Sequence, residues 1–63
     1  MLPRDPYILL SFVNTRLRDG YSELTELCAA LDAGEREITA ALAAVGYVYD
    51  RAQNRFVPAG GAS

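Results

Sequence analysis

Few side chains in this sequence are able to do chemistry, and their types and spacing form no catalytic group. The chain has no histidine, which is the commonest general base and metal ligand. Its single cysteine, Cys28, falls on the apolar stripe of an expected helix, which predicts a small core residue rather than a nucleophile. The eight carboxylates are scattered, and no glycine-rich phosphate loop occurs. The sequence therefore predicts no enzyme, no metal site, no cofactor and no small-molecule substrate.

The basic residues are the other group whose chemistry must be considered. All six are arginines: Arg4, Arg16, Arg18, Arg36, Arg51 and Arg55. The formal net charge is −2 and the sequence pI is about 4.8, whereas nucleic-acid-binding modules usually carry an excess of positive charge. A local basic patch remains compatible with this composition, because net charge does not describe how charges are distributed.

Three of the arginines are candidates for contact with DNA if the chain folds as a winged helix-turn-helix. Arg36 would lie on the third helix, and Arg51 and Arg55 would lie on the wing, where they could touch phosphates. Glu35 and Glu37 flank Arg36 and would repel the DNA backbone. A DNA-binding transcriptional regulator is therefore the alternative prediction, based on analogy of fold.

The first element that must position these residues is an amphipathic helix from Pro6 to about Arg18. Asp5 is expected to cap its start, and Asp19 and Gly20 to end it. One apolar stripe is formed by Leu9, Leu10, Val13 and Leu17. Ile8 and Phe12 form a second apolar patch, which either the C-terminal segment or another molecule is expected to cover.

Two shorter helices follow, from Glu23 to about Leu31 and from Glu35 to Val45. Ser22 is the expected cap of the former, and Gly46 is expected to close the latter in a left-handed conformation. Their apolar stripes share one helical spacing, and the short glycine-containing turn between them is typical of a helix-turn-helix.

A β-hairpin is predicted after Gly46, with strands at residues 47–49 and 55–57 and a polar loop from Asp50 to Asn54. Two strands alone are marginal in water, so Tyr47, Tyr49 and Phe56 are expected to anchor the hairpin to the helices. The predicted fold is mainly α with a small β-hairpin: a three-helix, helix-turn-helix domain that is winged-helix-like. It spans residues 1–57, and residues 58–63 form a flexible tail.

The first and third helices are expected to carry more apolar surface than the core can cover. The main functional prediction is therefore a protein-interaction or self-association module without catalytic activity. The expected interface residues are Ile8, Phe12, Ala40, Ala43 and Ala44, where small side chains on the third helix would let another element approach closely. Alanine is also simply a good helix former, so this composition has a second explanation. A cytoplasmic location and no membrane association are expected, because the apolar stretch at residues 7–10 is too short for a span.

Several motifs connect the sequence to a known family. They are Met1-Leu2-Pro3-x-Asp5-Pro6-x-x-Leu9-Leu10-Ser11-x-Val13-Asn14-x-x-Leu17-Arg18-Asp19, Tyr21-Ser22-x-Leu24-x-x-Leu27-Cys28, Leu31-Asp32, Gly46-Tyr47-x-Tyr49-Asp50 and Asn54-x-Phe56. In these motifs the chain resembles a family of short bacterial proteins known as domain of unknown function 4250. The resemblance implies a compact bacterial domain and carries no assigned activity or site. The alanine-rich third helix departs from the family pattern, which is rich in Lys and Glu there.

Overall fold

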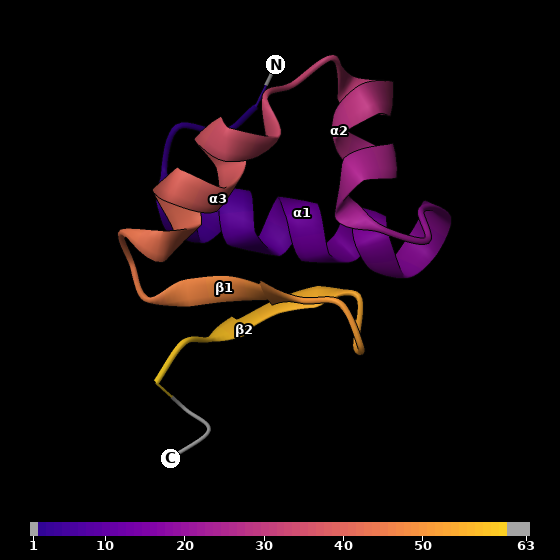
Figure 1. Cartoon of the computed structure of the whole chain (residues 1–63). Helices are drawn as coiled ribbons and strands as arrows, with labels where there is room; N and C mark the ends of the chain where they lie inside the picture. The colour runs from indigo at the N-terminus through magenta and orange to yellow at the C-terminus, as the bar shows by residue number, and fades with distance from the viewer. Residues whose placement is uncertain (1, 61–63) are drawn as a thin grey trace.

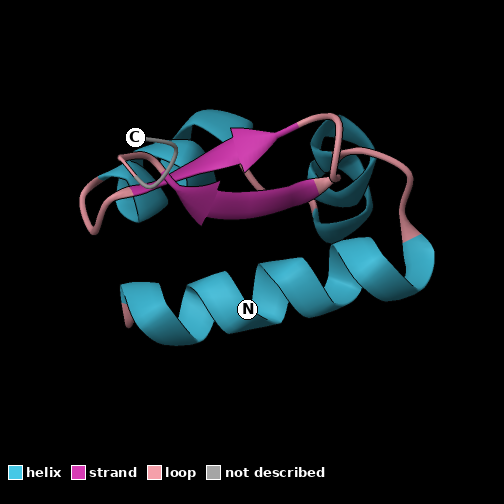
Figure 2. Cartoon of the chain, turned by 90° about the horizontal axis from the view of Figure 1, so that it is seen from below, coloured by secondary structure: helices cyan, strands magenta, loops and turns pink. Residues whose placement is uncertain are grey.

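The computed structural model describes residues 2–60 and contains three helices followed by a two-stranded antiparallel hairpin (Figure 1). The elements are α1 (Pro6–Gly20), α2 (Leu24–Leu31), α3 (Glu35–Ala43), β1 (Tyr47–Asp50) and β2 (Arg55–Pro58). The predicted fold class, mainly α with a small hairpin, is confirmed. Seen from below, the hairpin lies in front of the two shorter helices and beside α1, with β2 next to α1 and β1 next to α3 (Figure 2).

Helix α1 begins as its sequence predicts, but it ends later. The carboxylate of Asp5 accepts a hydrogen bond of 3.0 Å from the backbone N–H of Tyr7, so Asp5 is the N-cap. The helix continues through Asp19 and Gly20, which were expected to end it, and stops where Tyr21 becomes extended. Gly20 therefore acts as a helical residue and not as a left-handed terminator.

The start of α2 also differs from the prediction, because its N-cap is Glu23 and not Ser22. The side chain of Glu23 makes no capping hydrogen bond. Ser22 instead donates from its backbone N–H and its hydroxyl to the carboxylate of Glu26, at 2.7 and 3.1 Å. At the other end of α2, Asp32 takes the left-handed conformation, with φ of 54°.

Helix α3 is shorter than expected, because it ends at Ala43 and not at Val45. The N–H groups of Val45 and Gly46 bond back to the carbonyls of Leu42 and Ala43, which forms a tight turn. Gly46 has φ of +87°, as predicted, and this conformation lets the chain leave the turn directly into β1.

The core is a single cluster of buried side chains contributed by every helix and by β2. Its members are Leu9, Val13, Leu17, Leu24, Leu27, Cys28, Ile38, Leu42 and Phe56. Phe56 anchors the hairpin as predicted, while Tyr47 and Tyr49 are half-buried against the cluster. Leu10, expected on the inward stripe of α1, is also only half-buried.

The hairpin is slightly longer than predicted. Its register pairs Tyr47 with Pro58 and Asp50 with Arg55, so Pro58 belongs to β2. Residues 61–63 of the expected tail lie outside the described part of the chain. Within residues 2–60, no helix combines the length and apolar character needed to cross a bilayer.

Candidate functional site

The cysteine is placed as the sequence predicts, in the core on α2. Cys28 is buried, and burial raises the pKa of its thiol because the thiolate is poorly solvated there. The negative charge of Glu35 raises this pKa further. Among residues 2–60, no group of three or more His, Cys, Asp and Glu side chains is arranged to hold a metal ion.

The three arginines proposed for DNA contact do not meet in one place. Arg36 lines a groove between α3 and β1, and Arg55 lines a second groove between α1 and β2, at the opposite edge of the hairpin. Arg51 lies exposed in the hairpin loop and lines neither groove. Each groove therefore contains at most one of these three side chains.

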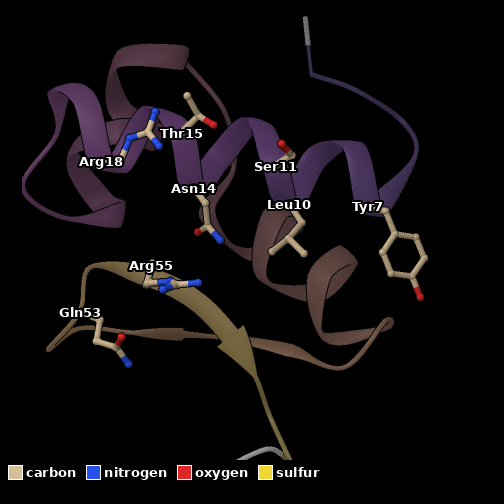
Figure 3. Close-up of a pocket in the computed structure, with 8 residues that line it drawn as sticks. All are labelled: Tyr7, Leu10, Ser11, Asn14, Thr15, Arg18, Gln53 and Arg55. Carbon is tan, nitrogen blue, oxygen red and sulfur yellow. The ribbon is translucent and has the colours of Figure 1, made fainter.

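The α1–β2 groove has a volume of about 570 Å³, and its surface mixes polar and apolar area although most of its lining residues are polar (Figure 3). Its lining residues are Tyr7, Leu10, Ser11, Asn14, Thr15, Arg18, Gln53 and Arg55. Several of its polar groups already have partners within the chain. The guanidinium of Arg18 pairs with Asp19 at 3.0 Å, and the amide of Gln53 donates to Asp50 at 2.9 Å. The charge of Arg18 and one donor of Gln53 are therefore already paired within the chain.

Asn14 points from α1 across this groove towards β2 and joins the helix to the strand (Figure 3). Its Oδ1 accepts from the backbone N–H of Phe56 at 2.7 Å, and its Nδ2 donates to the carbonyl of Phe56 at 3.2 Å. A side-chain amide carries the same donor and acceptor as a peptide group. Asn14 therefore makes the two hydrogen bonds to the Phe56 backbone that a neighbouring strand would make.

The α3–β1 groove is similar in size, about 550 Å³, but mainly apolar. Its lining residues are Arg36, Thr39, Ala40, Ala43, Tyr47, Val48, Tyr49 and Phe56. Val48 is 44% exposed, which is high for a large apolar side chain. Two of the predicted interface residues, Ala40 and Ala43, therefore lie side by side in one groove. Ala44 is exposed but is not part of its lining.

The other two predicted interface residues, on α1, do not behave as a pair. Ile8 is 57% exposed. Phe12 is half-buried against the core, and the guanidinium of Arg16 lies 5.1 Å from the centre of its ring. Phe12 thus belongs to the edge of the core, and the apolar patch expected on α1 is reduced to Ile8.

A polar network that the sequence did not reveal links three elements around Tyr49. The Tyr49 hydroxyl donates to Oδ1 of Asn54 at 2.6 Å and accepts from the backbone N–H of Leu24 at 3.2 Å. Nδ2 of Asn54 donates to the carbonyls of Leu17 and Tyr21, at 3.3 and 2.8 Å. Tyr49 thus caps α2, where Glu23 provides no cap, and Asn54 caps α1.

Fold and grooves together define a small three-helix domain that is packed against a hairpin and has one groove of mixed character and one apolar groove. The chain belongs to the family described as Domain of unknown function (DUF4250), which matches residues 3–56. The family resemblance drawn from its motifs is therefore confirmed. No curated protein and no solved structure matches the chain.

Several residues that carry the family resemblance have structural roles in this chain. Asn14 holds β2 to α1, while Tyr49 and Asn54 hold the hairpin to the ends of α1 and α2. Phe56 fills the core between them. These motif residues thus hold the fold together. The α3–β1 groove is lined partly by motif residues and partly by residues of α3 outside the motifs.

Proposed function

We propose that this chain is a protein-interaction module without catalytic activity, and that it binds its partner through the α3–β1 groove. The observation that supports this is the apolar groove of about 550 Å³. The small side chains of Ala40 and Ala43 leave this groove open on the side of α3. Binding surfaces for proteins combine apolar area with few charged residues at their centre. Arg36 is the one charged side chain in this lining.

A photocrosslinking experiment tests the groove as the interaction surface. A benzophenone side chain is introduced at Ala43 in the groove or, as the control, at Ala30, an exposed residue of α2 outside it. The proposal expects a discrete adduct in a lysate of the source cells from position 43 and none from position 30. The substitution Ala40→Phe, which fills the groove, is expected to remove the adduct. Equal adducts from both positions, or none from position 43, would contradict the proposal.

Light scattering after size exclusion distinguishes a different protein from a second copy as the partner. The chain has a mass of 6.8 kDa, so a dimer has twice the mass of a monomer. A monomer at micromolar concentration supports a different protein, and a dimer that Ala40→Phe dissociates supports self-association. Phe12→Asp is unsuitable as a test of the predicted interface, because Phe12 contacts the core.

The DNA-binding alternative has less support, because Arg36 and Arg55 lie in grooves at opposite edges of the hairpin. Fluorescence anisotropy with mixed duplex DNA at two salt concentrations tests it. Binding at low salt that weakens at high salt, and that Arg51→Gln and Arg55→Gln reduce, would favour this alternative over the interaction module.

A further inference from the structure

The two edges of the hairpin differ, and the edge of β2 is closed. At Phe56, the backbone N–H and C=O that point away from β1 are both bonded to the side chain of Asn14. At Pro58 there is no N–H to offer. Edge strands with free N–H and C=O groups recruit further strands, and proteins commonly block them with proline or cover them. The edge of β2 is blocked in both of these ways.

The edge of β1 is open. The N–H of Ala59 donates to the carbonyl of Gly46 at 2.7 Å, which fixes the alternation of the antiparallel ladder. Val48 and Asp50 therefore direct their backbone groups towards β2, while Tyr47 and Tyr49 direct theirs outwards. Within residues 2–60, no backbone or side-chain group bonds to these outward N–H and C=O groups of Tyr47 and Tyr49.

The open edge runs along the α3–β1 groove. Neighbouring strands lie about 4.8 Å apart, so an added strand would lie over the side of α3. Ala40 and Ala43 are the smallest of the four α3 side chains that line this groove, and their small size leaves room for the side chains of such a strand. Val48, which is 44% exposed, would lie beside the added strand on β1.

Charge indicates what kind of chain fits there. Arg36 is exposed at the groove, and among the described residues it takes part in no ion pair. An acidic side chain of a partner would find its complement there. The β1 strand of a second copy fits poorly, because its only acid, Asp50, already accepts hydrogen bonds from Ala52 and Gln53.

We infer that an extended segment of a partner protein adds to β1 as a third strand. Its backbone pairs with Tyr47 and Tyr49, its apolar side chains enter the α3–β1 groove at every second position, and an acidic residue pairs with Arg36. This is the strand-addition mode of peptide recognition, in which the backbone supplies affinity and the pockets supply specificity. The inference rests on the proposed interaction function and specifies how that function is carried out.

The test uses the full ¹⁵N-labelled chain and a synthetic probe, the blocked peptide acetyl-Asp-Val-Thr-Val-Thr-Val-amide. Saturable binding is expected in the submillimolar to millimolar range. The amide protons of Tyr47 and Tyr49 should shift downfield and exchange more slowly, because each gains an acceptor. Those of Val48 and Asp50, which are already bonded to β2, should change less. The same peptide with Asn in place of Asp should bind several-fold more weakly.

Three variants make the result specific to the groove. Ala40→Phe, which fills the groove, should abolish the shifts, whereas Ala44→Phe, at the C-cap of the same helix and outside the lining, should leave them unchanged. Arg36→Gln should weaken the Asp peptide several-fold and leave the Asn peptide unchanged. The amide spectrum of each free variant shows directly that it is folded.

Three results would overturn strand addition. These are no saturable shift at millimolar peptide, shifts centred on the α1–β2 groove, and shifts at Tyr47 and Tyr49 that depend only on the concentration of the protein itself. The last result would assign the edge to a second copy. If position 43 crosslinks specifically but the peptide has no effect on Tyr47 and Tyr49, the interaction function is retained and strand addition is rejected. If neither the crosslinking nor the peptide experiment gives its expected result, the interaction function and strand addition are both rejected.

Discussion

The side-chain amide of Asn14 and the backbone of Phe56, 42 residues apart in sequence, form a paired donor–acceptor contact that attaches the hairpin to α1. This contact replaces the strand that would otherwise extend the sheet. It holds the aromatic anchor of the hairpin in the core, and it leaves β1 as the edge at which a further strand can pair.

Replacement of Asn14 by Leu should destabilise the fold. Both backbone groups of Phe56 lose their partner, and an unsatisfied buried polar group typically costs about 1–3 kcal/mol. The free energy of unfolding, measured by urea titration with circular dichroism, should fall by about that amount. Ser11→Ala, at an exposed position on the same helix, should change it by less than about 0.5 kcal/mol. Equal stability of the two variants would show that the Asn14 contact contributes nothing.

Removal of the Tyr49 hydroxyl should have a similar but smaller effect. Tyr49→Phe keeps the ring, which packs 5.6 Å from the ring of Phe56, and loses the hydrogen bonds to Asn54 and Leu24. The expected loss of unfolding free energy is about 1–2 kcal/mol. Tyr7→Phe is the matched control, because the Tyr7 side chain is largely exposed. A control variant as destabilised as Tyr49→Phe would reject the role of the network.

Two glycines should respond to alanine with opposite signs. Neither has an atom within 4 Å of an added Cβ, so steric contact does not decide the outcome. Gly46 has φ of +87°, a conformation that costs an L-residue about 1–2 kcal/mol, so Gly46→Ala should lower the melting temperature. Gly20 is helical, and Gly20→Ala should be neutral or stabilise by up to about 1 kcal/mol. Thermal unfolding of both variants in parallel checks this prediction.

The hairpin loop should lose order in acid. The side chain of Gln53 is the main reason that the pKa of Asp50 lies below its ordinary value, and the N–H groups of Gln53 and Ala52 also lower it. A carboxyl with a lowered pKa stabilises the fold fully above its unfolded pKa of about 3.9. This contribution disappears as the pH falls through the folded pKa.

Carboxyl ¹³C NMR titration of Asp50 measures this shift directly. Gln53→Ala, which removes the side-chain donor, should move the Asp50 midpoint upwards towards its ordinary value. Arg51→Gln, a neighbouring loop substitution that removes none of these donors, should leave it in place. An Asp50 midpoint that does not respond to Gln53→Ala would show that the backbone donors alone set it.

Local sequence patterns were sufficient to predict the order and type of the elements. The helical spacing of Leu9, Val13 and Leu17 placed α1, and the change to alternating aromatic residues after Gly46 placed the hairpin. The errors lie at the ends of elements. Gly20 stays helical and Ser22 is not the cap of α2, because Glu26 binds Ser22 and the Tyr49 hydroxyl caps Leu24 instead.

The candidate site was predicted only in part, for a related reason. The small side chains of Ala40 and Ala43 are visible in the sequence, and they do line a groove. The open edge of β1 is not visible, because it depends on Asn14 closing the opposite edge through a contact between distant segments. The partial burial of Phe12, which the sequence predicts as an interface residue, is not visible for the same reason, since its contact with the core depends on tertiary packing.

The position of Phe56 in the core has a consequence for how the protein is made. A growing chain on the ribosome lacks this side chain until residues 1–55 have been joined, so the hydrophobic surfaces of α1 and α3 stay uncovered until then. The domain should therefore fold in one cooperative step only once the second strand has emerged from the ribosome, and a messenger truncated ahead of this strand should yield a product that is degraded rather than a smaller working version.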